Sequence, residues 1–381
     1  MHVPATLVRG GTSKCWLFPQ VHMPTHRDRI ERILVDAYGA ADPVQLDGIG
    51  GATPTTSKAA VVGASAREGI DIDYLFAQVG IGTGTVEWGS NCGNCATAIA
   101  LYAVSEGLVP LKGDRTLVVM RNINTGAVLE AEVDTPGGRV QEFGDRTVPG
   151  TLAGGVPVGL AFRDPAGATT GHLLPTGLPA QELPVGEHAA GGARTPNSGA
   201  PLIVSMLDAG APVVLVDAVR AGRTGAETLD QMRAEVPWLR ATRHAAAVRM
   251  GLVQPGAEPG DAVPKTGLIG PPVAYTTTLG EHVAAHEYDV SVRMLSMNSP
   301  HPAIGLTSAV AVAAANLVEG TVVASASTAP AGRVLRIGTP AGVLAVESSG
   351  AGPERVTVAR AARILCQARI LVRDLALPAA A

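Results

Sequence analysis

Short apolar runs separated by glycine turns dominate the first half of the chain. Runs of this length, rich in branched residues and bounded by turn residues, are typical of β-strands. They predict strands at residues 5–8, 59–62, 75–79, 116–120 and 128–133. One helix is expected from Arg27 to Tyr38, ending at Gly39, because glycine commonly follows the last helical residue.

A similar pattern returns in the second half, after a stretch at 165–200 rich in Gly, Pro and Thr. We interpret this stretch as the crossing between two domains. Beyond it, the pattern predicts strands at 202–207, 212–216, 290–295 and 321–324, and helices near 226–235 and 239–250. The sequence therefore predicts an α+β protein with domains at 1–184 and 185–381, the last ~10 residues being free to return to the first domain.

Two apolar, small-residue helices follow polar turns. Ser90-Asn91-Cys92-Gly93-Asn94-Cys95 leads into one at 96–104, and the segment 298–305 leads into the other at 306–315. The first N–H groups of a helix have no partners inside it, and the helix dipole favours an anion there. Each domain is thus expected to be a curled mixed sheet around one such helix. Both helices should start at the cleft between the domains, a common place for small-molecule sites.

Composition narrows the class of protein. The 381 residues suffice for two domains, and the net charge of −4 without a basic run argues against nucleic-acid binding. No apolar run approaches the ~20 residues of a membrane span, and the N-terminus lacks a signal-peptide pattern. Four scattered cysteines do not make a disulfide framework. A cytoplasmic protein with reduced thiols is expected.

Lys58 is the first candidate for chemistry. It ends the polar loop that begins at Gly48 and directly precedes the apolar run 59–62. A lysine at the mouth of a buried strand is partly desolvated, which lowers its pKa and lets it accept a proton. A surface lysine at a strand start is the other interpretation.

Cys92 is the second candidate. Its position at a helix start favours the thiolate, so the pKa of this thiol is expected to be low. A small buried core residue is the other interpretation, and it suits Cys95, one helical turn further on, better than Cys92. The two cysteines have CxxC spacing, but neither a second such pair nor clustered histidines accompany them.

Weaker candidates flank these positions. Thr12 and Ser13 follow a Gly-Gly turn and offer hydroxyl donors, although an ordinary hairpin turn explains them equally well. His301 lies between two prolines ahead of the second apolar helix, as a helix-capping or a ligand-binding residue. Lys265 and Arg293 are carboxylate partners or solvated surface charges.

Taken together, these segments resemble the PrpF family. The matching segments are Arg9–Lys14, Asp47–Lys58, Asp73–Val79, Asn91–Asn94, Leu173–Gly177, Pro264–Lys265 and Arg293–Met297, which span nearly the whole chain. PrpF-like proteins are cofactor-independent isomerases of unsaturated di- and tricarboxylates, such as 2-methylaconitate, 4-oxalomesaconate and methylitaconate. Their fold is that of diaminopimelate epimerase.

The resemblance implies an isomerase that carries out a 1,3-allylic proton shift without a cofactor or metal, with Lys58 and Cys92 as the acid–base pair. The substrate would be an aconitate-like acid, and neither nucleic acid nor membrane is an expected partner. A homodimer is left open. Substrate contacts are expected from Thr12, Ser13, Gly93, Asn94, Lys265, Arg293, Ser299 and His301.

The chain departs from the family pattern in its second half. Asn298-Ser299-Pro300 precedes His301 where glycine is usual, and Thr339 replaces a histidine in a late turn. These changes are expected to tune which acid is accepted. Two other functions stay open: an amino-acid racemase of the diaminopimelate type, and a non-catalytic tricarboxylate-binding protein. The racemase needs a second cysteine, and the second helix start offers only Ser299 and His301.

Overall fold

The computed structural model describes residues 2–89, 92–184, 201–254, 256–257, 260–329, 334–349 and 352–373. The chain forms two compact units, unit 1 being Met1–Leu160 with Arg360–Ala381 and unit 2 being Ala161–Ala359. Strands β8 (Val156–Arg163) and β19 (Arg355–Leu371) each run through the division. The division at residue 160 falls before the domain boundary at 184 that the sequence predicts. The reason is that residues 181–183 form strand β9, which pairs with β10 of unit 2.

Unit 1 contains a mixed sheet. Its elements are β1 (His2–Gly10), β2 (Ser13–Pro19), η1 (Gln20–His22), α1 (Arg27–Tyr38), β3 (Lys58–Ala64), β4 (Ile72–Val79), β5 (Val86–Glu87), α2 (Gly93–Ser105), β6 (Arg115–Asn122), β7 (Val128–Asp134) and η2 (Pro136–Gly138). Strand β2 is parallel to β3 and β4 is parallel to β6, whereas β1–β2, β3–β4 and β6–β7 are antiparallel. The C-terminal part of β19 returns to pair with β1.

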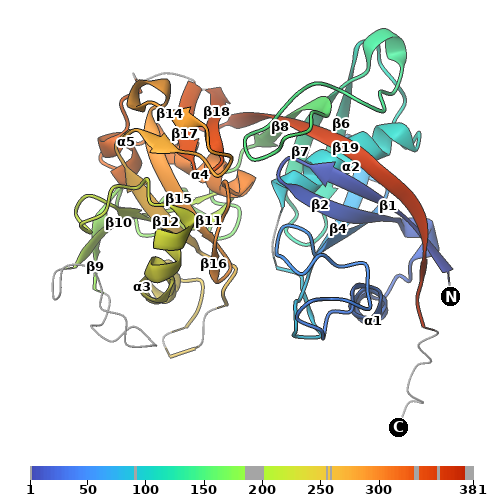
Figure 1. Ribbon diagram of the computed structural model, residues 1–381, viewed down its shortest axis with the longest axis horizontal. Helices are drawn as coiled ribbons and strands as arrows, with labels where there is room; N and C mark the ends of the chain where they lie inside the picture. The colour runs from blue at the N-terminus through green and yellow to red at the C-terminus, as the bar shows by residue number, and fades with distance from the viewer. Residues whose placement is uncertain are drawn as a thin grey trace. The chain divides into compact units, whose positions relative to one another are not determined.

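Helix α2 is the centre of unit 1. Every residue from Gly93 to Val104 is buried, and the helix packs against β1, β2, β6 and β7 (Figure 1). A helix that is apolar all round needs such full coverage, and its many alanines let the strands approach closely. Helix α1 belongs to a separate apolar cluster with Phe18, Val61 and Val79. It ends, as predicted, at Gly39 in the left-handed conformation.

The hairpin between β1 and β2 lies against the start of α2. A Cβ built on Gly10 would come 2.0 Å from the carbonyl oxygen of Asn94, and one on Gly11 would come 2.2 Å from Asn94 Oδ1. Gly11 also has a positive φ of 51°. Only glycine permits this approach at both positions.

We expect Gly10→Ala to lower the free energy of unfolding by ~2 kcal/mol or more, because the added methyl group meets backbone that cannot move aside. Urea denaturation measures this change. Gly159→Ala is the matched control, since its Cβ would meet only Glu132 Cβ, at 3.9 Å. Equal stabilities of the two variants would show that the hairpin can shift away from α2.

Unit 2 contains a second mixed sheet. Its elements are β9 (Gln181–Leu183), β10 (Leu202–Ala209), β11 (Ala211–Asp217), α3 (Leu229–Arg249), β12 (Lys265–Gly270), β13 (Tyr275–Thr276), β14 (His282–Val283), η3 (Ala285–Glu287), β15 (Val290–Ser296), β16 (Ser299–Pro300), α4 (Leu306–Asn316), α5 (Val322–Ala326), β17 (Val334–Thr339) and β18 (Gly342–Ser349). Strand β11 is parallel to β12 and β15 is parallel to β17. Helix α4 is buried from Leu306 to Ala315 and packs on β10, β11 and β18.

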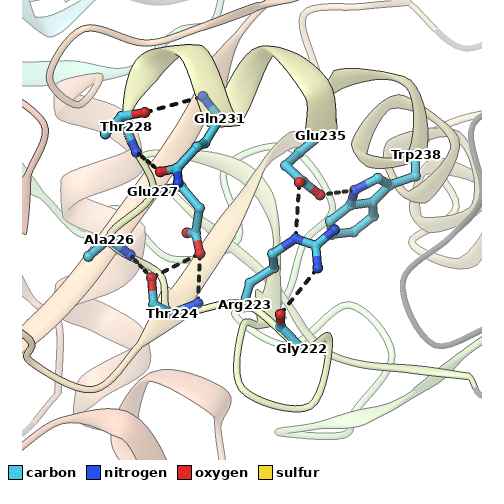
Figure 2. A network of polar contacts seen from close by, with 9 residues as sticks. All are labelled: Gly222, Arg223, Thr224, Ala226, Glu227, Thr228, Gln231, Glu235 and Trp238. Carbon is cyan, nitrogen blue, oxygen red and sulfur yellow. Dashed lines mark hydrogen bonds and ion pairs between the residues drawn. The ribbon is translucent and has the colours of Figure 1, made fainter.

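A single helix, α3, replaces the two predicted near 226–235 and 239–250. Pro237 lies inside it and removes one N–H donor, which normally disfavours a helix interior. The helix continues because Met232, Trp238 and Leu239 bury their side chains in one apolar cluster. Figure 2 shows its start, where Thr228 and Gln231 form a capping box, and the Glu235 carboxylate, which accepts from Trp238 Nε1.

The strand predicted at 321–324 is wrong, because residues 322–326 form the short helix α5. Thr321 is its N-cap, and the Thr321 hydroxyl accepts from the N–H of Ala324 at 3.1 Å. A threonine directly after Gly320 was a usable sign of a helix start. Within the described ranges, no helix has the length and apolar character needed to cross a membrane.

Candidate active site

Helix α2 brings three of the predicted substrate-binding residues of unit 1 together. The side-chain amide nitrogen of Asn94 donates to Thr12 Oγ1 at 3.1 Å and to Ser13 Oγ at 3.3 Å. Gly93, the first helical residue, is buried next to Asn94 in the same helix. The glycine hairpin makes this possible, since it lets the hydroxyl-bearing turn reach the helix start. The hydroxyls and the first N–H groups of α2 thus form one group of hydrogen-bond donors.

Cys92 is the N-cap residue of α2, with an extended backbone and a half-buried side chain. A hydrogen bond with the Cys95 thiol and burial raise the pKa of the Cys92 thiol well above its usual value, although the charge of Lys58 lowers it. The expectation of a low pKa at this helix start is therefore wrong. The neighbouring thiol and burial outweigh the charge of Lys58 and the hydrogen bond with the backbone of Cys95, both of which lower the pKa. At neutral pH, Cys92 holds its proton.

Lys58 is the first residue of β3 and is half-buried. Its Nζ donates to Gln78 Oε1 at 2.5 Å and lies 5.4 Å from the centre of the Phe76 ring. Gln78 is fixed in turn, because its Nε2 donates to the carbonyl oxygen of Ser57 at 3.0 Å. The amine is thus held in one position in unit 1, where its charge acts on the thiol of Cys92.

Arg360 is a site residue that sequence reasoning missed. It comes from β19, and its Nη2 donates to Asn94 Oδ1 at 3.1 Å. The side chain is 3% exposed, and burial lowers its pKa to about 10, although a thiolate at Cys92 would raise it. It therefore stays charged at neutral pH. The sequence held one sign of this position. Alternate residues of a strand face the same side, so Arg360 faces the same side as the buried Val356 and Val358.

Two further thiols, those of Cys95 and Cys15, lie near Cys92. Cys95 affects the pKa of Cys92, and Cys15 affects that of Cys95. Both are buried, and Cys15 Sγ donates to the carbonyl oxygen of Trp16 at 3.7 Å. Burial and Cys15 raise the pKa of the Cys95 thiol well above its usual value. Cys95 is thus an inner residue of the helix, as the sequence favoured. Within the described ranges, no three His, Cys, Asp or Glu side chains converge in a way that could hold a metal ion.

In unit 2, the residues before α4 occupy one face of the sheet. The His301 N–H donates to the carbonyl oxygen of Met294, and its ring Nδ1 accepts from the N–H of Ala303 at 3.0 Å. The histidine is buried, whereas Ser299 in β16 is exposed. Met294 pairs with Gly267 of β12, and strand alternation puts Lys265 on the same face. Lys265 and His301 thus belong to one face of this sheet.

Arg293 lies on the opposite face. Its Nε donates to the carbonyl oxygen of Glu227, directly before α3, and its Nη1 donates to those of Val292 and Gly338. The guanidinium also stacks 5.0 Å from the centre of the Tyr275 ring. It lines a cavity of about 630 Å³ with residues at the start of α3. The structure therefore does not bring Arg293 together with Lys265 and His301.

Thr339 closes the turn between β17 and β18. It is 1% exposed, and its hydroxyl donates to the carbonyl oxygen of Gly342 at 2.8 Å. The threonine thus has a complete structural explanation as a turn residue. Its expected influence on substrate choice stays a prediction.

Comparison with known proteins decides the family. The model of the PrpF protein family matches residues 1–373. This chain belongs to the PrpF family. The PrpF relatives include the (4E)-oxalomesaconate Delta-isomerase of Novosphingobium sp. strain KA1, which is 35% identical over 91% of each chain. The 2-methyl-aconitate isomerase of Shewanella oneidensis is 32% identical over 97% of this chain and 96% of the relative. The expectation of an isomerase is confirmed by these PrpF relatives.

Solved structures agree with the fold expected for a PrpF protein. The crystal structure of methylitaconate-delta-isomerase has a TM-score of 0.79, with 28% identity over 99% of each chain. A hydroxyproline epimerase from Agrobacterium vitis has a TM-score of 0.51 with 11% identity, over 97% of this chain and 92% of its own. The epimerase likeness concerns the fold alone. The diaminopimelate epimerase-like α+β fold is thereby confirmed.

The thiol pair provides a first test of the electrostatics of this site. In Cys95→Ala, we expect alkylation of Cys92 by iodoacetamide to begin at a lower pH than in the wild type. The hydrogen bond that raises the pKa of Cys92 is lost, so the reactive thiolate forms earlier as pH rises. Mass spectrometry of labelling rates across a pH series measures this shift. The exposed Cys366 is the internal control and should keep its profile. An unchanged Cys92 profile would contradict the assigned cause.

Proposed function

We propose that this protein isomerises an unsaturated di- or tricarboxylate of the aconitate type by moving a proton across an allylic system. The observation that carries the proposal is the grouping of Lys58, Cys92 and Asn94 in unit 1. The charge of Lys58 lowers the pKa of the Cys92 thiol, and Asn94, two residues further along the chain, donates to Thr12 Oγ1. The substrates named for the PrpF relatives, oxalomesaconate, 2-methyl-aconitate and methylitaconate, are acids of this class. These names support the class of substrate, an unsaturated polycarboxylate, but do not identify which acid this protein uses.

The proposed chemistry begins with removal of a proton from the carbon beside the alkene. Lys58 takes this proton after it has given up its own proton to solvent, and the electrons delocalise into the neighbouring carboxylate as a dienolate. Cys92 then returns a proton to the far end of the allyl system. Its raised pKa supports the role of proton donor, because a thiol that is protonated at neutral pH has a proton to give.

The charge and proton balance closes within this pair. Lys58 and Cys92 begin as amine and thiol and end as ammonium and thiolate. The reverse transfer, or exchange with solvent, restores them. Negative charge that develops on the substrate carboxylate would be stabilised by the N–H groups at the start of α2 and by the hydroxyls of Thr12 and Ser13. Contacts from Lys265, Ser299 and His301 to the substrate stay predictions.

A screen by ultraviolet absorbance tests the proposed function, because migration of a double bond conjugated to a carboxylate changes the spectrum. We expect turnover of at least one acid among aconitate, 2-methylaconitate, itaconate and oxalomesaconate analogues. Racemisation of proline and diaminopimelate, followed by chiral chromatography, is the comparison arm. Racemisation without any isomerisation would replace the proposal by the racemase alternative. Binding of a tricarboxylate without turnover of any acid would favour a non-catalytic binding protein.

A further inference from the structure

Arg360 is an unusual charge for a protein interior. It is almost completely buried, and its only hydrogen bond among the described residues goes from Nη2 to Asn94 Oδ1. Its Nε is buried and has no hydrogen-bond partner in the described part of the chain. A buried guanidinium normally has a carboxylate or several acceptors around it, because desolvation of a charge is costly. Within the described part of the chain, no carboxylate forms an ion pair with Arg360.

The contact with Asn94 determines which way the amide of that residue faces. Its oxygen is engaged by Arg360, so its nitrogen points to the oxygens of Thr12 and Ser13. Each of these hydroxyls accepts a hydrogen bond there, and its own hydrogen stays available to donate elsewhere. Reversal of the amide would make both hydroxyls donate to Asn94 instead. By fixing the orientation of the Asn94 amide, Arg360 therefore keeps the hydroxyl hydrogens of Thr12 and Ser13 free to donate to a ligand.

We infer that Arg360 is a positioning residue for a carboxylate subsite formed by Thr12, Ser13 and Asn94. The inference deepens the proposed function and rests on it for the identity of the ligand as a substrate carboxylate. A carboxylate is the anion that fits, since it accepts several hydrogen bonds from neutral donors around one buried positive charge. The glycines at 10 and 11 belong to the same arrangement. A Cβ on Gly11 would lie 3.4 Å from Arg360 Nε as well as 2.2 Å from Asn94 Oδ1.

The test uses tricarballylate, a saturated tricarboxylate that has no double bond to isomerise. Calorimetry of the full-length protein with this probe measures carboxylate binding without turnover. We expect Arg360→Lys to weaken tricarballylate binding at least ~10-fold, or ~1.4 kcal/mol, because lysine keeps the charge but cannot hold the amide as the planar guanidinium does. For an isomerised acid, KM should rise with little change in kcat.

Arg363→Lys is the matched control. Arg363 lies on the same strand, and its Nε is also buried with no hydrogen-bond partner among the described residues. Its guanidinium stacks on Phe143 instead of contacting Asn94. This variant should bind tricarballylate like the wild type. A double-mutant cycle then separates positioning from general destabilisation. If Arg360 acts through Asn94, Arg360→Lys has no further effect on binding in an Asn94→Ala background.

A second pair of variants covers the case in which Arg360→Lys does not fold. Thr12→Val and Ser13→Ala leave Arg360 and Asn94 in place and remove one donating hydroxyl each, so both should weaken tricarballylate binding. Wild-type affinity in Arg360→Lys, additive effects in the cycle, or no loss in both hydroxyl variants would overturn the inference. Failure of the proposed function has a different signature. Tricarballylate would still bind in an Arg360-dependent way, but no unsaturated acid would be isomerised.

Discussion

Lys58→Met is expected to lower kcat by ~10²–10⁴-fold while the protein stays folded, since this is the usual contribution of a general acid or base. Methionine keeps the apolar stem against Phe76 and removes only the amine, which the structure holds on Gln78. Steady-state kinetics on the acid found by the absorbance screen, with circular dichroism as the folding check, measures the effect.

Lys112→Met is the control for Lys58→Met, because Lys112 is an exposed lysine between α2 and β6. It should retain wild-type kcat and KM. A Lys58→Met variant whose kcat stays within a few-fold of the wild type would remove this lysine from the mechanism. A loss confined to KM would make it a binding residue.

Cys92→Ala is expected to have the second large effect, again ~10²–10⁴-fold in kcat, because it removes the proposed proton donor. The small alanine fits at the N-cap without disturbing the buried helix behind it. Cys366→Ala is the control, since this thiol is exposed on β19. If Cys92→Ala kept wild-type kcat, the thiol would not be the donor.

The pH dependence of the wild type follows from the raised pKa of Cys92. The donor is protonated, and therefore competent, at low and neutral pH. Its contribution disappears as pH rises through the thiol's pKa. We therefore expect kcat to fall on the alkaline side, with a midpoint above the ordinary thiol value of ~8.5. Cys95→Ala should move this alkaline fall to lower pH, in parallel with the alkylation profile of Cys92.

The local pattern of the sequence predicts elements well where backbone preferences agree with packing. Helix α1 begins at Arg27 and ends at Tyr38 as expected, because Gly39 supplies a left-handed residue at its end. Pattern fails where tertiary contacts prevail. Pro237 does not end α3, because the surrounding side chains are buried together, and Thr321 starts a helix in a segment whose residues favour a strand.

In the candidate site, too, some residues could be predicted from local sequence and others could not. Cys92, Asn94 and the Thr12–Ser13 turn could be predicted, because a helix start and a glycine turn have local signatures. Arg360 could not be placed with them, since it is 266 residues from Asn94 in sequence. The pKa of Cys92 was missed for a related reason. The helix start is visible in sequence, whereas burial and the hydrogen bond with the Cys95 thiol depend on the folded neighbourhood.

Proton transfer between the protein and an unsaturated polycarboxylate is the central claim, and hydrogen–deuterium exchange tests it most directly. The acid identified by the absorbance screen is incubated in D₂O with the enzyme, and ¹H NMR follows each allylic position. We expect the wild type and Lys112→Met to introduce solvent deuterium at both ends of the allyl system. Lys58→Met should lower exchange at both ends by the same factor as its kcat, whereas Cys92→Ala should lower exchange by its kcat factor only at the far end, where the thiol returns the proton. Isomerisation without deuterium in the product, or equal exchange by all four proteins, would contradict the central claim.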